Sequence, residues 1–181
     1  AGSTPDERLY ILVCDGGVAV RIPSKPGTIL MDGPLPAGLA MGDPVYLGRM
    51  EGGICYVVGI PGRAVLPEGW EIMPVRDLDG VFPDGMGALA AYAVRILGFD
   101  LGAAFCGYCG TKTHTVLTER ARVCPACNQV VYPRISPAII VLVTRGDEVL
   151  LARGPRSPPG FYSLIAGFNE PGENLEQTVF R

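Results

Sequence analysis

The sequence lacks any long hydrophobic segment. Its longest uninterrupted apolar run covers residues 88–94, whereas a helix that crosses a bilayer needs about 20 apolar residues. It also lacks an opening in which basic residues precede an apolar stretch, the pattern of a secretory signal peptide. We therefore expect a soluble, cytoplasmic protein that does not insert into a membrane.

Charged side chains are few and nearly balanced. They make up 18% of the 181 residues and give a formal net charge of −3. Residues 1–105 carry 12 acidic and 7 basic side chains, and residues 106–181 carry 6 and 8. So small a basic excess is not the concentrated basic face of a nucleic-acid-binding protein, and it suits a small anionic substrate equally well.

Glycine and proline are abundant, with 25 and 17 residues, which favours short strands and many turns. Two strand–turn–strand patterns are present, with apolar runs at residues 9–14 and 18–22, and again at 45–50 and 54–60. The first pair flanks an Asp-Gly turn, a dipeptide that tolerates the positive φ of a tight hairpin. We expect a small, mostly antiparallel β domain.

The period of the apolar residues changes in residues 84–97. They recur there at spacings of three and four, which is typical of an amphipathic helix, and Asp84 stands where an N-cap residue is expected. A helix packed under the β domain accounts for this stretch. Cys14 and Cys55 lie in the apolar runs and are expected to be buried small hydrophobes.

The other four cysteines form two C-x-x-C pairs, Cys106/Cys109 and Cys124/Cys127. Two such pairs supply the closed four-thiolate shell of a structural zinc site. Two disulfides or a redox pair are the competing interpretation, but the absence of a secretory signal favours a metal. His114, the only histidine, is surplus to a four-cysteine set and is expected to be solvated.

The segment between the two pairs, residues 111–123, is rich in Thr and Val with an alternating pattern, which predicts a hairpin. Zinc ribbons also occur in nucleic-acid-binding proteins, and this one offers Lys112, Arg120 and Arg122. Tyr108 is its one nearby stacking platform, which is thin support for such a role. We favour a structural role in which the ribbon joins two domains.

Strand-like segments return after the ribbon. Residues 138–143 form an apolar run that predicts a strand buried on both faces. Residues 148–153 are expected to return beside it as its hairpin partner. A further strand over residues 161–166 leads into the last segment of the sequence, AGFNEPGENLEQTVFR.

Gly167, Glu173 and Arg181 in that last segment have the spacing G-x5-E-x7-R. The spacing opens the signature of the Nudix hydrolases, a box that folds as loop–helix–loop. Most Nudix enzymes have no zinc ribbon in front of the box. A β-rich front domain, a helix, two cysteine knuckles and then the box resemble the NADH pyrophosphatase branch of this family.

The resemblance implies an α+β fold with three parts. Residues 1–100 would form a β-rich, rudimentary Nudix-like domain ending in a helix, and residues 101–132 a zinc ribbon. Residues 133–181 would form the first part of a Nudix α/β/α sandwich domain. Members of this branch are homodimers whose subunits build shared sites, so a homodimer is expected.

The reaction implied by the resemblance is hydrolysis of the diphosphate linkage of NADH or NAD, giving NMNH or NMN and AMP. It uses Mg²⁺ or Mn²⁺ beside the structural Zn²⁺, and some members also remove the NAD cap from RNA. Metal ions stabilise the charge that grows as water attacks a diphosphate. Two alternatives stay open: a zinc-ribbon module that binds nucleotide or RNA without cleaving it, and a Nudix hydrolase for another nucleoside diphosphate derivative.

Three residues of the box take catalytic or metal-binding roles under the resemblance. Ala166 would ligate the catalytic ion through its backbone carbonyl, while Glu173 and Arg181 would pair and support the catalytic helix. The remaining glutamates of the signature, in R-E-U-x-E-E, where U is a bulky aliphatic residue, would follow Arg181. We therefore expect the 181-residue chain by itself to hydrolyse NADH at no detectable rate.

Four further residues match substrate-binding positions of the family. Tyr132 and Phe168 would stack on the nicotinamide nucleotide, and Glu119 and Arg76 would contact the substrate. Three have a simpler interpretation: Phe168 as a packing residue, Tyr132 as a strand end, and Glu119 as a solvated charge. Arg76 is the weaker match, because the segment around it is loose. The chain also departs from the family, because Phe99-Asp100 stands where a Trp-His pair is usual.

Overall fold

The computed structural model describes residues 7–22, 27–50, 53–78, 81–82 and 85–181. The chain divides into two compact units, Ala1–Pro133 and Arg134–Arg181. Strands in several small sheets with few helices make an α+β protein, as expected. The three domain bounds and the α/β/α sandwich stay predictions. None of the described helices is long and apolar enough to cross a membrane.

A six-stranded sheet forms the front of the first unit. Its strands are β1 (Glu7–Cys14), β2 (Gly17–Arg21), β3 (Met31–Asp32), β4 (Val45–Met50), β5 (Gly53–Gly59) and β6 (Trp70–Pro74). The order is β4-β5-β1-β2-β6, and β3 pairs with β1. Every pairing is antiparallel except β1 with β5, which run parallel in the middle of the sheet.

Both expected hairpins are present, and the turn of the first follows from its sequence. Asp15 has φ 47° and Gly16 has φ 79°, the pair of positive values that a two-residue hairpin turn requires. The short β3 and the edge strand β6 are not predicted by the sequence reasoning, because both lie in segments rich in proline and glycine.

The alternation of β1 builds one core on each face of the sheet. Ile11 and Val13 contribute to the cluster that includes α1, and Leu12 and Cys14 to the cluster on the other face. Cys55 belongs to the first cluster and is 1% exposed. The expectation that Cys14 and Cys55 are buried is confirmed.

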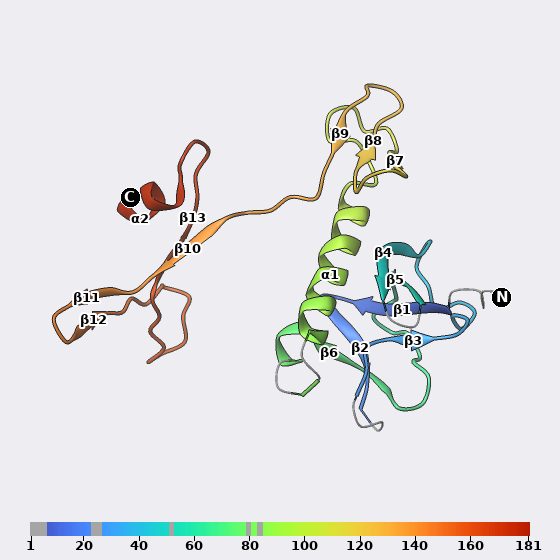
Figure 1. The fold of residues 1–181 in the computed structure, drawn as a ribbon, viewed down its shortest axis with the longest axis horizontal. Coiled ribbons are helices and arrows are strands. Elements are labelled where there is room, and N and C mark those ends of the chain that lie inside the picture. The colour runs from blue at the N-terminus through green and yellow to red at the C-terminus, as the bar shows by residue number, and fades with distance from the viewer. Residues whose placement is uncertain (1–6, 23–26, 51–52, 79–80, 83–84) are drawn as a thin grey trace, which may run out of the picture. The chain divides into compact units, whose positions relative to one another are not determined.

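Helix α1 (Met86–Gly102) packs on this sheet through Ala90, Ala93, Ile96 and Leu97 (Figure 1). A short 3-10 helix, η1 (Val75–Asp77), precedes it. The N-cap of α1 is Gly85, and Asp84, the expected cap, lies outside the described residues. The helix continues past its expected end at residue 97, and its last turn carries Asp100.

The ribbon follows α1 as a three-stranded sheet of β7 (His114–Thr115), β8 (Arg122–Val123) and β9 (Val130–Val131), in that order. The antiparallel pairing of β7 with β8 confirms the hairpin expected in residues 111–123. His114 is exposed, as expected.

The second unit holds β10 (Ala138–Val141), β11 (Val143–Arg145), β12 (Glu148–Leu150), β13 (Ile165–Phe168) and helix α2 (Leu175–Phe180). Strand β10 pairs antiparallel with β13, and β11 with β12. The strand expected over residues 161–166 begins only at Ile165, and Ser163 forms an isolated bridge with Ala152.

Two expectations for this unit are wrong. Residues 138–143 are not one strand buried on both faces: the run breaks at Leu142, and Ile140 is 69% exposed. Within the described residues β10 has one paired neighbour and one short helix to cover it, too little to bury both faces. The returning segment pairs with β11 instead of β10, because the break divides the expected strand in two.

Candidate functional site

The two cysteine pairs lie on turns of the same construction. The Cys106 amide donates to Thr111 O at 2.8 Å and the Gly110 amide to Cys106 O at 2.9 Å. In the second turn, the Cys124 amide donates to Gln129 O and the Asn128 amide to Cys124 O, both at 2.9 Å. Gly110 and Asn128 occupy the matching position in each turn with φ 75° and 60°. This left-handed conformation favours glycine and asparagine.

These turns bring the four sulfur atoms into one group, in which all lie within 4.8 Å of one another. Cys109 Sγ is 3.4 Å from Cys124 Sγ and 3.6 Å from Cys127 Sγ. Sulfur atoms bound to one tetrahedral zinc ion at about 2.3 Å lie about 3.8 Å apart. Those joined in a disulfide lie about 2.05 Å apart. The spacing fits zinc, and all four cysteines are free.

The surroundings of the cluster lower the pKa of two of its thiols, whereas burial and the neighbouring thiols raise the pKa of Cys127 to about 12. The side chain and backbone of Thr111 hydrogen-bond Cys109, and this lowers the pKa of the Cys109 thiol to about 6. Backbone amides in the first turn likewise lower the pKa of Cys106. Thiolates form readily at Cys106 and Cys109, and the grouping of four free sulfur atoms is what fits a structural zinc ion.

A buried arginine joins the ribbon to the end of α1. Arg122 is 8% exposed and forms an ion pair with Asp100 of α1. Its Nε donates to Thr113 Oγ1 at 2.8 Å and one terminal nitrogen to Thr113 O at 3.1 Å. Thr113 Oγ1 in turn bonds Ala103 O. The sequence singled out Asp100 only as a departure from the family pattern, and the structure makes it the partner of Arg122.

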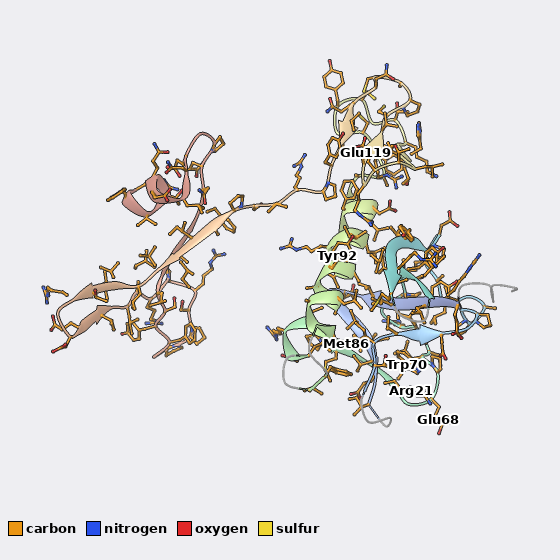
Figure 2. All side chains as sticks on the ribbon, viewed as in Figure 1. Arg21, Glu68, Trp70, Met86, Tyr92 and Glu119 are labelled. Atoms are coloured by element: carbon orange, nitrogen blue, oxygen red, sulfur yellow. The ribbon has the colours of Figure 1, made fainter. Side chains whose placement is uncertain are left out.

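A second arginine joins the turn of the ribbon to the sheet. Arg120 donates to the carbonyls of Tyr46 and Leu47 in β4, at 2.9 and 3.2 Å. Its guanidinium carbon lies 5.6 Å from the centre of the Tyr92 ring on α1. Figure 2 labels Tyr92 on that helix and Glu119 on the ribbon. The sequence named Arg120 only as a candidate nucleic-acid contact.

Two of the proposed substrate-binding residues are brought together on the ribbon. The Tyr132 hydroxyl lies 3.3 Å from both carboxylate oxygens of Glu119. The negative charge of Glu119 raises the pKa of the Tyr132 phenol. Tyr132 is 53% exposed and remains available for stacking. The pair thus offers an aromatic face beside a carboxylate, a combination that suits a nucleoside.

Arg76, the third proposed contact in this unit, lies in η1. Its side chain is 87% exposed and its guanidinium is 3.5 Å from the carboxylate of Asp77. A contact at that distance between exposed groups is a weak one. Arg76 is therefore accessible to a ligand, and its role in binding stays a prediction.

In the second unit, Glu173 and Arg181 form the ion pair that the family resemblance implies. Arg181 Nε donates to Glu173 Oε1 at 2.7 Å, and a terminal nitrogen donates to Glu173 Oε2 at 3.0 Å. The same terminal nitrogen bonds Phe168 O at 2.9 Å. The guanidinium of Arg181 thereby links the last residue of β13, Phe168, to Glu173 in the loop that precedes α2.

Glu173 has further partners on its own loop. The Glu170 amide and the Thr178 hydroxyl both donate to Glu173 Oε2 at 3.0 Å. Hydrogen bonding from Arg181 is the main reason that the pKa of Glu173 falls to about 2. Asn174 caps α2 through a reciprocal capping box with Gln177. Both oxygens of the Glu173 carboxylate therefore accept hydrogen bonds that stabilise the loop.

Ala166 and Phe168 lie on β13 beside this loop. Ala166 helps to line a hollow whose other walls include Ile139, Thr178 and Arg181. Phe168 is 68% exposed. Both placements agree with the expected roles without testing them, and the roles of all the proposed site residues in catalysis and binding stay predictions.

The residues of the second unit do not by themselves form a site for Mg²⁺ or Mn²⁺. Hard cations need several oxygen ligands, and here Ala166 offers one carbonyl while Glu173 is occupied by its loop partners. Among the described residues, the four cysteines are the one group of three or more histidine, cysteine, aspartate or glutamate side chains placed to hold a metal.

Comparison with known families assigns both parts of the first unit. The family described as "NADH pyrophosphatase-like rudimentary NUDIX domain" matches residues 7–98. The family described as "NADH pyrophosphatase zinc ribbon domain" matches residues 103–132. The second match supports the reading of the cysteine cluster as a zinc site.

Curated relatives extend the likeness through the box. The NAD-capped RNA hydrolase NudC of Deinococcus radiodurans is 41% identical over 194 aligned positions, which cover 98% of this chain and 67% of that protein. The NudC proteins of Chromobacterium violaceum and Stutzerimonas stutzeri are 42% and 44% identical, covering 81% and 77% of this chain. They are covered over 55% and 47% of their own length, so the chain spans about half to two thirds of these relatives.

The matches cover the sheet, the ribbon and the box in the order in which the structure places them. The chain belongs to the NADH pyrophosphatase family of Nudix hydrolases.

Proposed function

We propose that the protein hydrolyses the diphosphate linkage of NADH or NAD, to AMP and NMNH or NMN, with Mg²⁺ or Mn²⁺. The observation that carries the proposal is a four-cysteine ribbon followed by a box in which the Glu173–Arg181 pair is formed. Relatives that match 98% and 81% of this chain are named NAD-capped RNA hydrolases. Removal of an NAD cap from RNA is therefore a second reaction of the same site.

The exposed groups suit a dinucleotide. Tyr132 and Phe168 present aromatic faces on which a base or a nicotinamide ring can stack, and Glu119 presents a carboxylate that can accept a hydrogen bond from a ribose hydroxyl. Arg76 presents an exposed cation suited to a phosphate. We propose these four residues as the substrate contacts, in a cytoplasmic homodimer.

A divalent ion belongs to the proposed reaction because water attack adds charge to a group that is already anionic. The described part of the chain supplies Ala166 O as a possible ligand. The other ligands are assigned to the glutamates that follow the arginine in the family signature. Dependence on the ion is therefore part of the proposal, to be tested by chelation.

The test is chromatographic detection of the products. The full-length gene product is incubated with NADH, NAD, ADP-ribose or ATP, with Mn²⁺ or with EDTA, and the nucleotides are separated. Equal amounts of AMP and NMNH from NADH, with Mn²⁺ only, support the proposal. Cleavage of ADP-ribose or ATP with none of NADH would show a Nudix hydrolase of another specificity.

A second candidate function is binding without cleavage. It is favoured by the small basic excess of residues 106–181 and by the exposed Tyr108 on the ribbon. Filter-binding titrations with NAD-capped and triphosphate RNA at several salt concentrations decide it, because binding to phosphates weakens steeply with salt. Salt-sensitive binding without AMP release would support this candidate, and no binding at all would exclude it.

A further inference from the structure

The ribbon contacts the sheet at an irregular part of strand β4. Strand β4 is an edge strand, and its pairing with β5 shifts between Tyr46 and Gly48. Leu47 is the extra residue of this β-bulge, and a bulge in an edge strand leaves backbone groups without ladder partners. The carbonyls of Tyr46 and Leu47 are therefore open to a donor from outside the sheet.

Arg120 is that donor. Two of its terminal nitrogens reach the two adjacent carbonyls at 2.9 and 3.2 Å. The Tyr92 ring lies against the guanidinium, and the Tyr92 hydroxyl donates to Leu47 O at 3.5 Å. The planar fork of arginine matches two neighbouring acceptors and stacks on an aromatic face, which the single ammonium of lysine does not reproduce.

The turn that carries Arg120 also carries Glu119. The Val116 amide donates to Ala121 O, and the Ala121 amide donates to Glu119 O, both at 3.0 Å. The zinc ligands lie at the opposite end of this hairpin, beyond β7 and β8. The metal therefore does not hold the turn directly, and the bonds of Arg120 to β4 tie it down.

We infer that Arg120 is a positioning residue, which locks the ribbon turn to the bulge of β4 and so holds Glu119 against Tyr132 in the arrangement that receives the dinucleotide. The substrate part of this inference rests on the proposed function. The positioning of Glu119 by Arg120 does not depend on any substrate. The positioning and the substrate parts of the inference can therefore be disproved separately.

The Tyr132 phenol reports on the positioning. The charge of Glu119 raises its pKa, so release of Glu119 lowers it toward the ordinary value. Loss of a nearby cation has the opposite effect, since it makes the phenolate less favourable. A fall in the Tyr132 pKa in Arg120→Ala therefore reports movement of Glu119, and it cannot come from the lost charge itself.

The experiment titrates ¹³C-labelled tyrosine by NMR in the zinc-loaded full-length gene product, with Tyr132→Phe to assign the signal. Glu119→Gln gives the Tyr132 pKa without the carboxylate charge. Arg120→Ala is expected to move the pKa most of the way to that reference, and Arg120→Lys part of the way. Lys112→Ala, which removes an exposed cation from the same ribbon, should leave it unchanged.

Zinc content and NADH affinity complete the test. Arg120→Ala should retain its zinc and bind NADH about tenfold more weakly, the change expected from the loss of about one hydrogen bond to substrate. An unchanged or raised Tyr132 pKa in Arg120→Ala overturns the positioning inference, whatever the affinity. An unsubstituted protein that binds no NADH overturns the proposed function and the substrate part of the inference, and leaves the Tyr132 result to decide the positioning.

Discussion

Arg122 of the ribbon is buried against Asp100 of helix α1, and the two side chains form an ion pair at the junction of ribbon and helix. Arg122 also donates hydrogen bonds to the side-chain hydroxyl and to the backbone carbonyl of Thr113. The junction therefore depends on a charge that water does not solvate. Removing one partner of such a pair leaves the other charge buried without compensation.

Arg122→Ala is expected to lower the free energy of unfolding of the first unit by about 3–5 kcal/mol. Asp100→Asn keeps an oxygen that accepts a hydrogen bond but leaves the buried Arg122 guanidinium without its counter-charge, so it should cost about 3 kcal/mol. Denaturant unfolding at fixed zinc concentration, followed by circular dichroism, measures both. Arg76→Ala is the control, because its exposed pair with Asp77 should contribute less than about 1 kcal/mol. Equal losses for Arg122→Ala and Arg76→Ala would contradict this account.

Zinc should be found at close to one ion per chain by elemental analysis of the purified protein. Replacement of Cys106 or Cys124 by Ser should release the ion and unfold the ribbon, because metal binding and folding are one equilibrium in such modules. Cys55→Ser, outside the cluster, should leave the zinc content unchanged. Protein that lacks zinc while all four ribbon cysteines titrate as thiols would refute the site.

The ion pair of the box should respond to acid. The pKa of Glu173 is lowered from 4.5 to about 2 by its hydrogen bond with Arg181, so its contribution to stability is complete above about pH 4.5 and is lost as the pH falls toward 2. NMR titration of the glutamate carboxyl carbons should show one midpoint near 2. Arg181→Ala should bring that midpoint up toward the ordinary range, whereas Glu176→Gln should not move it. A midpoint near 4.5 in the unsubstituted protein would contradict the observed pairing.

The sequence was sufficient where the determining contacts are local. Each cysteine pair lies within one turn, and the spacing alone predicts the cluster of four sulfurs. The Asp15-Gly16 turn and the Glu173–Arg181 pair likewise depend on residues close together in the chain. Recognition of the family followed from the order of these local motifs and is confirmed by the comparisons.

The sequence was insufficient where the partners are distant. Arg120 bonds a carbonyl 74 residues away, and the acceptor exists only because β4 is a bulged edge strand. Arg122 and Asp100 are 22 residues apart and meet because α1 extends past its expected end. The prediction that residues 138–143 are buried was wrong for a related reason. Burial of a strand depends on the elements packed against it, and an apolar run does not specify these.

Hydrolysis of NADH in water enriched in ¹⁸O tests the central claim most directly. If water attacks one phosphorus of the diphosphate, the bridging P–O bond breaks and a single ¹⁸O atom appears in the phosphate of either AMP or NMNH. Mass spectrometry of the products from the full-length gene product with Mn²⁺ should show one label, in AMP or in NMNH, and no free nicotinamide. Release of nicotinamide with ADP-ribose, or unlabelled AMP and NMNH, would contradict the account.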